Sequence, residues 1–288
     1  MLRLLVIIFC IFVIILCKIN LKNKIIDRYG NKERIILCLF GVIPRSIKYT
    51  WDSIQKNIVD VLSKEYIVDI YVFNLNIENT LVDDKILNQK DINLIPYDYF
   101  EEEYQKDIDL KIDNKCTLED CKLKKFYSDI TTRNAIRQMY SEYKVGLFLE
   151  KHNYDKTVIV GPDFYIYNKI NMNDFNSIKA KKIYTSNIHD CYGYTNGFYF
   201  GKTKDMIKIL SRYNNMNKFK KNNDNYELVV KNSFKYNNIK RKVTNILFYK
   251  IRADGHIKTL QKLKNNKKIY DNIKNILIKK YKIEKGIN

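Results

Sequence analysis

The 288-residue chain contains little glycine and proline, and it has none of the short motifs that identify several common enzyme classes. Nine glycines and three prolines exclude collagen-like and proline-rich linker sequences. No GxxxxGK[ST], GxGxxG, HExxH or GxSxG sequence occurs, which disfavours P-loop phosphoryl transfer, dinucleotide redox, zinc proteolysis and α/β-hydrolase chemistry. The three histidines are dispersed, and no Cys/His pair has the spacing of a structural zinc site.

Charge and apolar content are both high. The 52 Lys and Arg residues against 32 Asp and Glu give a formal net charge of +20, while 45% of the residues are apolar, which excludes a disordered chain. Alanine occurs only at Ala135, Ala180 and Ala253, and this usage is typical of an AT-rich coding sequence that would also enrich lysine. The alternative is a selected attraction to phosphate groups of a nucleic acid, an anionic membrane or a nucleotide. Since no zinc-finger, RRM or basic-zipper signature is present, we do not expect a nucleic-acid partner.

A wholly apolar run from Leu4 to Cys17, flanked by Arg3 and Lys18, lies near the amino terminus. As a helix it covers ~21 Å of a ~30 Å hydrocarbon core, and snorkelling of the flanking basic residues brings it close to a marginal span. No small residues follow the run as a signal-peptidase site requires, which favours an uncleaved anchor over a cleaved signal peptide or a buried helix. We expect a single-pass, type II membrane protein. The basic residues after the run favour the opposite sidedness, so the sidedness stays open.

Apolar and amphipathic segments then alternate along the chain. A wholly apolar segment at 35–40, ended by Gly41, is typical of a strand that is buried on both faces of a parallel sheet. An amphipathic helix over 47–62 and a strand over 66–73 complete a βαβ unit, for which a right-handed crossover is expected. The acidic stretch 74–115 is predicted as a connection with short elements. Further strands are predicted at 156–160, 164–167, 183–185, 198–200 and 245–252, and helices at 118–151, 204–212 and 225–236.

This alternation predicts a single α/β domain with a mostly parallel sheet over residues 35–256. We expect four parts in all: the anchor at 1–20, a basic stalk at 21–34, the α/β domain, and a basic helical tail at 257–288.

Unusual polar residues follow the predicted strands, at the ends where ligands bind in an open α/β sheet. The loop 41–46 leads into a helix, so its backbone N–H groups and Arg45 could hold a phosphate; a plain connecting loop is the alternative. Asp163 directly follows a strand, where a metal ion, a ribose hydroxyl or a turn cap would explain a carboxylate. Asp190 and Asp254 have the same interpretations, with turn capping favoured for Asp254. Carboxylates at loop ends suit an oxygen-ligated Mg²⁺ or Mn²⁺.

Several short motifs follow one another in a fixed order over roughly residues 35–256. They are LCLFGVIPRSIKYTWDSI, Arg137-Gln138-Met139-Tyr140, Gly161-Pro162-Asp163, Gly193-Tyr194-Thr195-Asn196-Gly197-Phe198 with Phe200-Gly201, and Glu227 followed by Arg252-Ala253-Asp254-Gly255. In this order they resemble a group of poorly characterised, glycosyltransferase-like proteins with a GT-A-type, nucleotide-sugar-binding α/β fold.

The resemblance implies a GT-A-like (Rossmann-like) domain that transfers a sugar from a nucleotide-sugar donor to an unknown acceptor. Asp190 and Glu227 become the candidates for the catalytic base, and Asp163 becomes the candidate ligand for a divalent metal, Mn²⁺ or Mg²⁺. The residues expected to bind the donor are Gly41, Arg45, Arg137, Asp163, Gly193, Asn196 and Asp254.

The motifs also depart from the family pattern. Gly161 stands where the family usually has Arg, and Asn196-Gly197 stands where it usually has Asp-Arg. Asn can coordinate a metal through its carbonyl oxygen, but it cannot act as a base or neutralise charge. A catalytically inactive member that serves as a binding or structural protein is therefore one alternative, and a basic, membrane-tethered protein that binds nucleic acid or anionic lipid is another.

Overall fold

A computed structural model describes residues 32–78, 81–115, 121, 128–188, 190–219, 225–258 and 267–281. The predicted anchor at 1–20 and most of the predicted stalk lie outside these residues. Within the described part of the chain, no helix combines the length and the apolar character that a membrane crossing needs.

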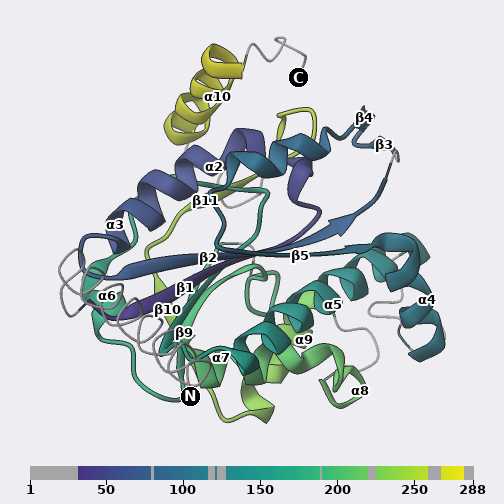
Figure 1. Ribbon diagram of the computed structural model, residues 1–288, viewed down its shortest axis with the longest axis vertical. Coiled ribbons are helices and arrows are strands. Elements are labelled where there is room, and N and C mark those ends of the chain that lie inside the picture. The colour runs from purple at the N-terminus through teal and green to yellow at the C-terminus, as the bar shows by residue number, and fades with distance from the viewer. Residues whose placement is uncertain are drawn as a thin grey trace, which may run out of the picture.

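A seven-stranded sheet forms the centre of the domain, in the order β10-β8-β9-β6-β1-β2-β5 (Figure 1). Neighbouring strands run parallel in four pairs, β1 with β2, β1 with β6, β2 with β5 and β8 with β10, whereas β9 is antiparallel to both β6 and β8. The predicted α/β fold with a mostly parallel sheet is confirmed. The strands are β1 (Arg34–Gly41), β2 (Ile67–Asn76), β5 (Tyr99–Tyr104), β6 (Lys156–Val160), β8 (Lys182–Ser186), β9 (Phe198–Lys202) and β10 (Lys240–Thr244).

Helices cover both faces of the sheet (Figure 1). Alternate side chains of β1 enter two separate cores, with Leu37 and Leu39 on one side and Cys38 and Phe40 on the other. Coverage on both faces explains why β1 is apolar at consecutive positions. On one face, α2 (Ile47–Ile54) continues through a π-helical segment (Gln55–Val59) into α3 (Asp60–Leu62). On the other face lie α5 (Asp129–Lys151), α7 (Thr203–Leu210) and α9 (Tyr226–Tyr236).

Further elements complete the described part of the fold. They are the 3-10 helices η1 (Ile43–Arg45), η3 (Gln89–Leu94) and η4 (Ser211–Tyr213), the hairpin of β3 (Leu81–Val82) with β4 (Lys85–Ile86), and the helices α4 (Gln105–Lys115), α6 (Met172–Asn176), α8 (Met216–Phe219) and α10 (Lys267–Tyr281).

A second, three-stranded sheet corrects one prediction. The segment predicted to continue the strand at 156–160 instead forms β7 (Phe164–Ile166), which pairs with β11 (Phe248–Ile251) in the order β12-β11-β7, with β12 at Ile257–Lys258. A turn at Gly161, in which the Phe164 N–H donates to the Gly161 carbonyl at 3.1 Å, ends β6 and separates the two strands. This small sheet brings β11 and β12 to the carboxyl end of the large one.

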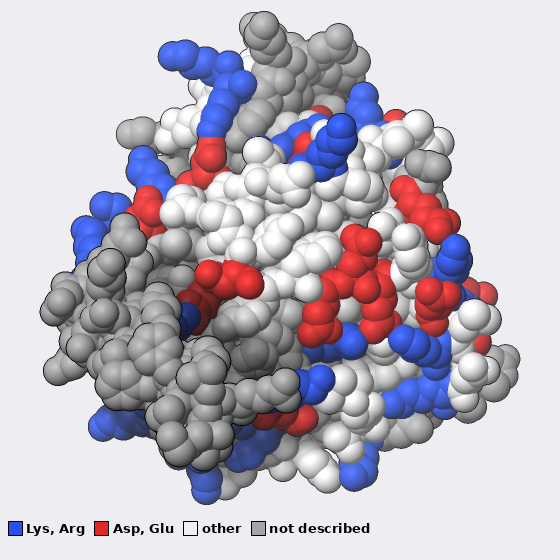
Figure 2. All heavy atoms as spheres, in the orientation of Figure 1, with Lys and Arg blue, Asp and Glu red and all other residues white. Residues whose placement is uncertain are grey.

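The sequence predicted neither edge strand of the large sheet: β10 precedes the strand expected at 245–252, and β5 lies in the segment predicted as a connection. The Glu-rich sequence of β5 has low strand propensity, but Lys144 of α5 pairs with both Glu103 (2.8 Å) and Glu101 (3.6 Å) on the partly buried face. In Figure 2 acidic side chains gather over β5, with Lys and Arg scattered around them. On the face shown, the net charge of the chain does not produce one continuous basic surface.

Candidate functional site

A cavity of about 760 Å³ lies where the parallel strands β1, β2 and β6 end. Its lining includes Gly41 at the end of β1, Leu75 near the end of β2 and Asp163 after β6, together with residues of α5, the first turn of α9, and β11 and β12. The carboxyl ends of parallel strands are the usual ligand position in open α/β sheets, and the volume falls within the ~300–1,000 Å³ of small-molecule sites.

The cavity brings together most of the residues that the sequence singled out. Those that line it are Gly41, Arg45, Arg137, Asp163, Asn196 and Glu227. The other three, Asp190, Gly193 and Asp254, are described but are not part of its lining.

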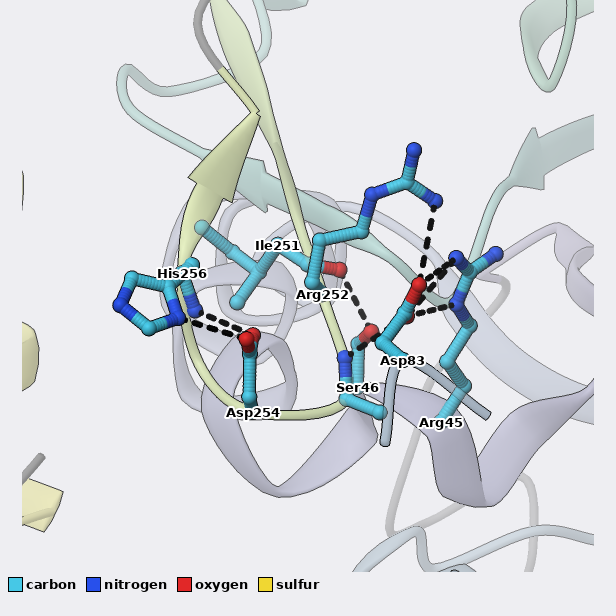
Figure 3. A network of polar contacts seen from close by, with 8 residues as sticks. Arg45, Ser46, Asp83, Ile251, Arg252, Asp254 and His256 are labelled. Atoms are coloured by element: carbon cyan, nitrogen blue, oxygen red, sulfur yellow. Dashed lines mark hydrogen bonds and ion pairs between the residues drawn. The ribbon is translucent and has the colours of Figure 1, made fainter. Parts of the chain in front are cut away.

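Arg45 already has an anionic partner from within the chain (Figure 3). Its Nε and Nη2 atoms donate to the Asp83 carboxylate at 2.9–3.1 Å, and the Ala253 N–H adds a bond of 3.2 Å to the same group. Burial alone would raise the pKa of Asp83, but Arg45, the Ala253 N–H and the nearby Arg252 hold that pKa below its ordinary value. The hairpin that carries Asp83 is thereby tied to the loop after β1 and to the end of β11.

Asp254 sits in the turn between β11 and β12, next to this network (Figure 3). Its carboxylate accepts the His256 N–H at 2.9 Å and lies 2.6 Å from the His256 Nδ1 atom. Gly255 in the same turn has a φ of 85°, a left-handed conformation that glycine adopts without strain. These contacts correspond to the turn-capping alternative for Asp254.

Glu227 occupies the first turn of α9, where local contacts fix its backbone. Asn225 caps the helix by accepting the Leu228 N–H at 2.8 Å, and its amide donates to the Cys191 carbonyl at 2.6 Å. Gly193 packs so closely that a Cβ atom there would lie 2.0 Å from the Glu227 carbonyl carbon and oxygen. The Tyr194 N–H also donates to the Glu227 carbonyl at 2.9 Å. Gly193 therefore positions Glu227 rather than lining the cavity itself.

The environment of Glu227 alters its acidity. Burial raises the pKa of the Glu227 carboxyl above its ordinary value, opposed by the positive charges of Lys250 and Lys258 and reinforced by the negative charge of Asp190. A carboxylate with a raised pKa at the wall of a ligand-sized cavity is suited to act as a general base.

Asp190, the other candidate for the base, is engaged in structural contacts. Its two oxygens each accept a hydrogen bond from Arg241 at 2.8 Å, and one of them also accepts the Thr195 N–H at 3.1 Å. The Arg241 guanidinium lies 4.5 Å from the centre of the Tyr194 ring. These contacts order the loop that packs on Glu227, and of the two candidate carboxylates only Glu227 lines the cavity.

The residues around Asp163 do not match the predicted Mg²⁺ or Mn²⁺ site. In the described part of the chain, no group of three or more His, Cys, Asp or Glu side chains is arranged to hold a metal ion. Asp163 is one carboxylate on a wall shared with Lys250 and Lys258, and the Asn196 carbonyl oxygen faces the Lys250 ammonium at 3.5 Å. A divalent cation there would meet the like charge of the lysines, so this donor set does not fit one.

Arg137, which the sequence did single out, is already paired with Asp109 at 2.6–2.7 Å. Sequence reasoning missed three cations, which lie in β11, in β12 and directly after β11. Lys250, Arg252 and Lys258 also line the cavity, and none of them was selected. A signal existed for two of them, because residues 250 and 252 lie two apart in a predicted strand and so share a face.

No protein-family model matches the chain, and no curated protein matches it. Among solved structures, the chain is similar to the apo form of the glycosyltransferase GlyE from Streptococcus pneumoniae TIGR4, with a TM-score of 0.40 and 10% identity over 74% of this chain and 45% of that one. It is also similar to the apo form of mouse xyloside xylosyltransferase 1, with a TM-score of 0.42 and 8% identity over 73% of this chain and 84% of that one. The chain thus spans less than half the length of GlyE. Similarities of this strength carry no argument about function, which has to come from the site.

Proposed function

We propose that this protein is a glycosyltransferase that transfers a sugar from a nucleotide-sugar donor to an acceptor hydroxyl. The observation that carries the proposal is the cavity at the carboxyl end of the parallel strands, which places Glu227, with its raised pKa, on the same lining as a group of cations. The motif order along residues 35–256 favours the same reaction class.

The lining contains both apolar and charged side chains. Leu75, Ile77 and Val82 supply apolar surface near the ends of β2 and the β3–β4 hairpin, where a nucleoside can pack. Gly41 has a φ of 102°, and a Cβ atom there would meet nothing within 4 Å, so a ligand can approach its backbone closely. Glu227, Lys250 and Lys258 add charged side chains to the lining, and in our proposal these receive the diphosphate and the sugar.

In the proposed reaction the anomeric carbon exchanges its bond to a phosphate oxygen for a bond to the acceptor oxygen. The electron pair of the broken bond stays on the departing nucleoside diphosphate, whose added charge the cations of the lining stabilise. The proton of the acceptor hydroxyl passes to the Glu227 carboxylate.

The purified full-length chain, incubated with a panel of nucleotide sugars with and without Mn²⁺, tests the proposal by calorimetry and by release of nucleoside diphosphate. We expect one donor to bind, and we expect Glu227→Gln to keep donor binding while turnover falls by roughly 10²-fold or more. Glu150→Gln is the matched control, because Glu150 is exposed on α5 away from the cavity. Absence of binding with every donor would refute the proposal. Binding without turnover would favour the inactive alternative, which Asn196 motivates.

We also propose that residues 1–20 anchor the protein in a membrane, as a single-pass, type II protein. The support is the apolar run between Arg3 and Lys18. Alkaline carbonate extraction of cell membranes should leave the full-length chain in the pellet and release a variant that lacks residues 2–20. Release of both would refute anchoring, and protease protection of the intact vesicles would decide the sidedness.

A further inference from the structure

Two lysines stand directly opposite each other on neighbouring strands of the small sheet, on the wall of the cavity. Lys250 of β11 and Lys258 of β12 are register partners in an antiparallel pair, and both line the cavity. Phe164 of β7 is the next residue in the same row, and its ring centre lies 5.3 Å from the Lys250 ammonium. Like charges directly opposite each other destabilise a strand pair, so this placement has a cost that an anion between them would remove.

Arg252 adds a third positive charge on the same wall. It follows Lys250 by two residues, and its side chain also lines the cavity. Its guanidinium comes no closer than 4.0 Å to Asp83, whose carboxylate is already held at both oxygens by Arg45. Arg252 therefore keeps hydrogen-bond donors for a ligand.

The two lysines lack close counter-charges. Within the part of the chain that the structure describes, neither ammonium group has a carboxylate within 4 Å, and the Lys250 Nζ atom has only the Asn196 oxygen, at 3.5 Å. Burial, together with the positive charges of Arg252, Lys250 and Arg45, lowers the pKa of Lys258, and Asp163 only partly offsets them. Arg45 and Arg137 differ in this respect, because each is paired with a carboxylate at 3 Å or less.

We propose that Lys250, Arg252 and Lys258 bind the diphosphate of a nucleoside diphosphate sugar directly, and so replace the divalent cation that the residues around Asp163 do not fit. The inference rests on the proposed glycosyltransferase function and deepens it by assigning the leaving group to these three side chains. A diphosphate carries several negative charges on neighbouring groups, which suits two opposed ammonium groups and a guanidinium.

Calorimetric titration of the full-length chain with inorganic pyrophosphate in EDTA tests the inference. We expect binding without metal, weakening as salt is raised, and a change of less than about threefold when EDTA is replaced by Mn²⁺. Lys250→Met and Lys258→Met should each weaken binding by roughly tenfold or more, as expected when a hydrogen bond to a charged group is lost. Lys242→Met is the matched control, because Lys242 is an exposed lysine on β10 outside the cavity, and it should bind like the wild type.

Thermal melting without ligand separates a lost anion site from a damaged fold. Each lysine variant should melt at or above the wild-type temperature, because it removes one of two opposed like charges. Pyrophosphate binding that requires Mn²⁺, or unchanged binding by the Lys250→Met/Lys258→Met double variant, would overturn the inference. Sugar transfer that depends on Mn²⁺ would overturn it while leaving the proposed function intact. Metal-free pyrophosphate binding without binding of any nucleotide sugar would support the anion site and refute the proposed function.

Discussion

The buried ion pair between Arg212 and Glu142 makes a sharp test of how the site is supported. Both side chains have no exposed surface, and the Arg212 Nη2 atom donates to the Glu142 carboxylate. The Tyr226 hydroxyl lies 3.2 Å from the Arg212 Nη2 atom and donates to Glu142 at 3.0 Å. The network thus joins η4, α5 and the first turn of α9, immediately before Glu227.

Arg212→Met leaves the Glu142 carboxylate buried without its cation. Loss of one partner of a buried pair costs about 3–5 kcal/mol of unfolding free energy, a large part of the 5–15 kcal/mol typical of a domain. Replacing both partners, as Arg212→Met with Glu142→Leu, removes the buried charges together and is often close to neutral. The Tyr226 hydroxyl then loses its partners, at a cost of about 1–3 kcal/mol. The double variant should therefore be more stable than Arg212→Met by about 2 kcal/mol.

Urea unfolding of the full-length chain measures these differences through Trp51, the one tryptophan, which is 7% exposed on α2. Arg133→Met is the control on α5, because its pairs with Asp109 and Asp113 are more exposed and should contribute about 0–1 kcal/mol. A loss below about 1 kcal/mol for Arg212→Met would refute the reasoning. A double variant as unstable as the sum of the two single variants would refute it as well.

Three further predictions concern the cavity and its surroundings. Gly193→Ala should lower both the melting temperature and the turnover, because its Cβ would collide with the Glu227 backbone, whereas Gly146→Ala in α5, with no contact closer than 3.4 Å, should be neutral or stabilising in the same melts. The pKa of Glu227 is raised in the folded state, so ionisation of this residue destabilises the fold. Below the ordinary glutamate pKa of about 4.3, the wild type and Glu227→Gln should therefore have the same melting temperature. As pH rises through the raised pKa, the wild type should become the less stable of the two. Equal melting temperatures at all pH values would contradict that sign. Because the pKa of Asp83 is lowered, Asp83→Asn should cost about 1 kcal/mol in urea unfolding at pH 7, and the cost should disappear as pH falls below the ordinary aspartate pKa of about 3.9 toward the lowered one.

The fold was predictable where local pattern and tertiary burial agree. The apolar segment 35–40 became β1, and the segment 156–160, which is apolar at its last three residues, became β6; both strands are buried, because a strand covered on two faces buries consecutive side chains. Edge strand β5 was missed because its glutamates are poor strand formers, and the side chains that pair with them come from other elements: Lys144 of α5 contacts Glu101 and Glu103, and Asn74 of β2 donates to Glu102. Strand β7 was expected to continue β6, because the periodicity of a segment does not reveal that a turn has moved the chain into another sheet.

The site was predictable only in part, for a related reason. Asp163 and Glu227 were selected from their positions after a strand and in a motif, and the fold does bring both to one cavity. The partner of Arg45 was not predictable, because Asp83 comes from a hairpin in the acidic connection. The opposition of Lys250 and Lys258 depends on the register of β11 with β12, which composition does not encode.

The position of α9 links the two sides of the proposed reaction. The loop with Gly193 packs on the backbone of Glu227, the Arg212 network holds the preceding Tyr226, and the charges of Lys250 and Lys258 act on the Glu227 carboxyl. Binding of an anion between the lysines would neutralise the charges that now favour the ionised form of Glu227. The pKa of Glu227 should then rise further, so that the base takes up the acceptor proton more readily once the donor diphosphate is in place. A pH profile of turnover shifted to higher pH with donor bound than in the free enzyme is the expected result, and a shift to lower pH would refute this coupling.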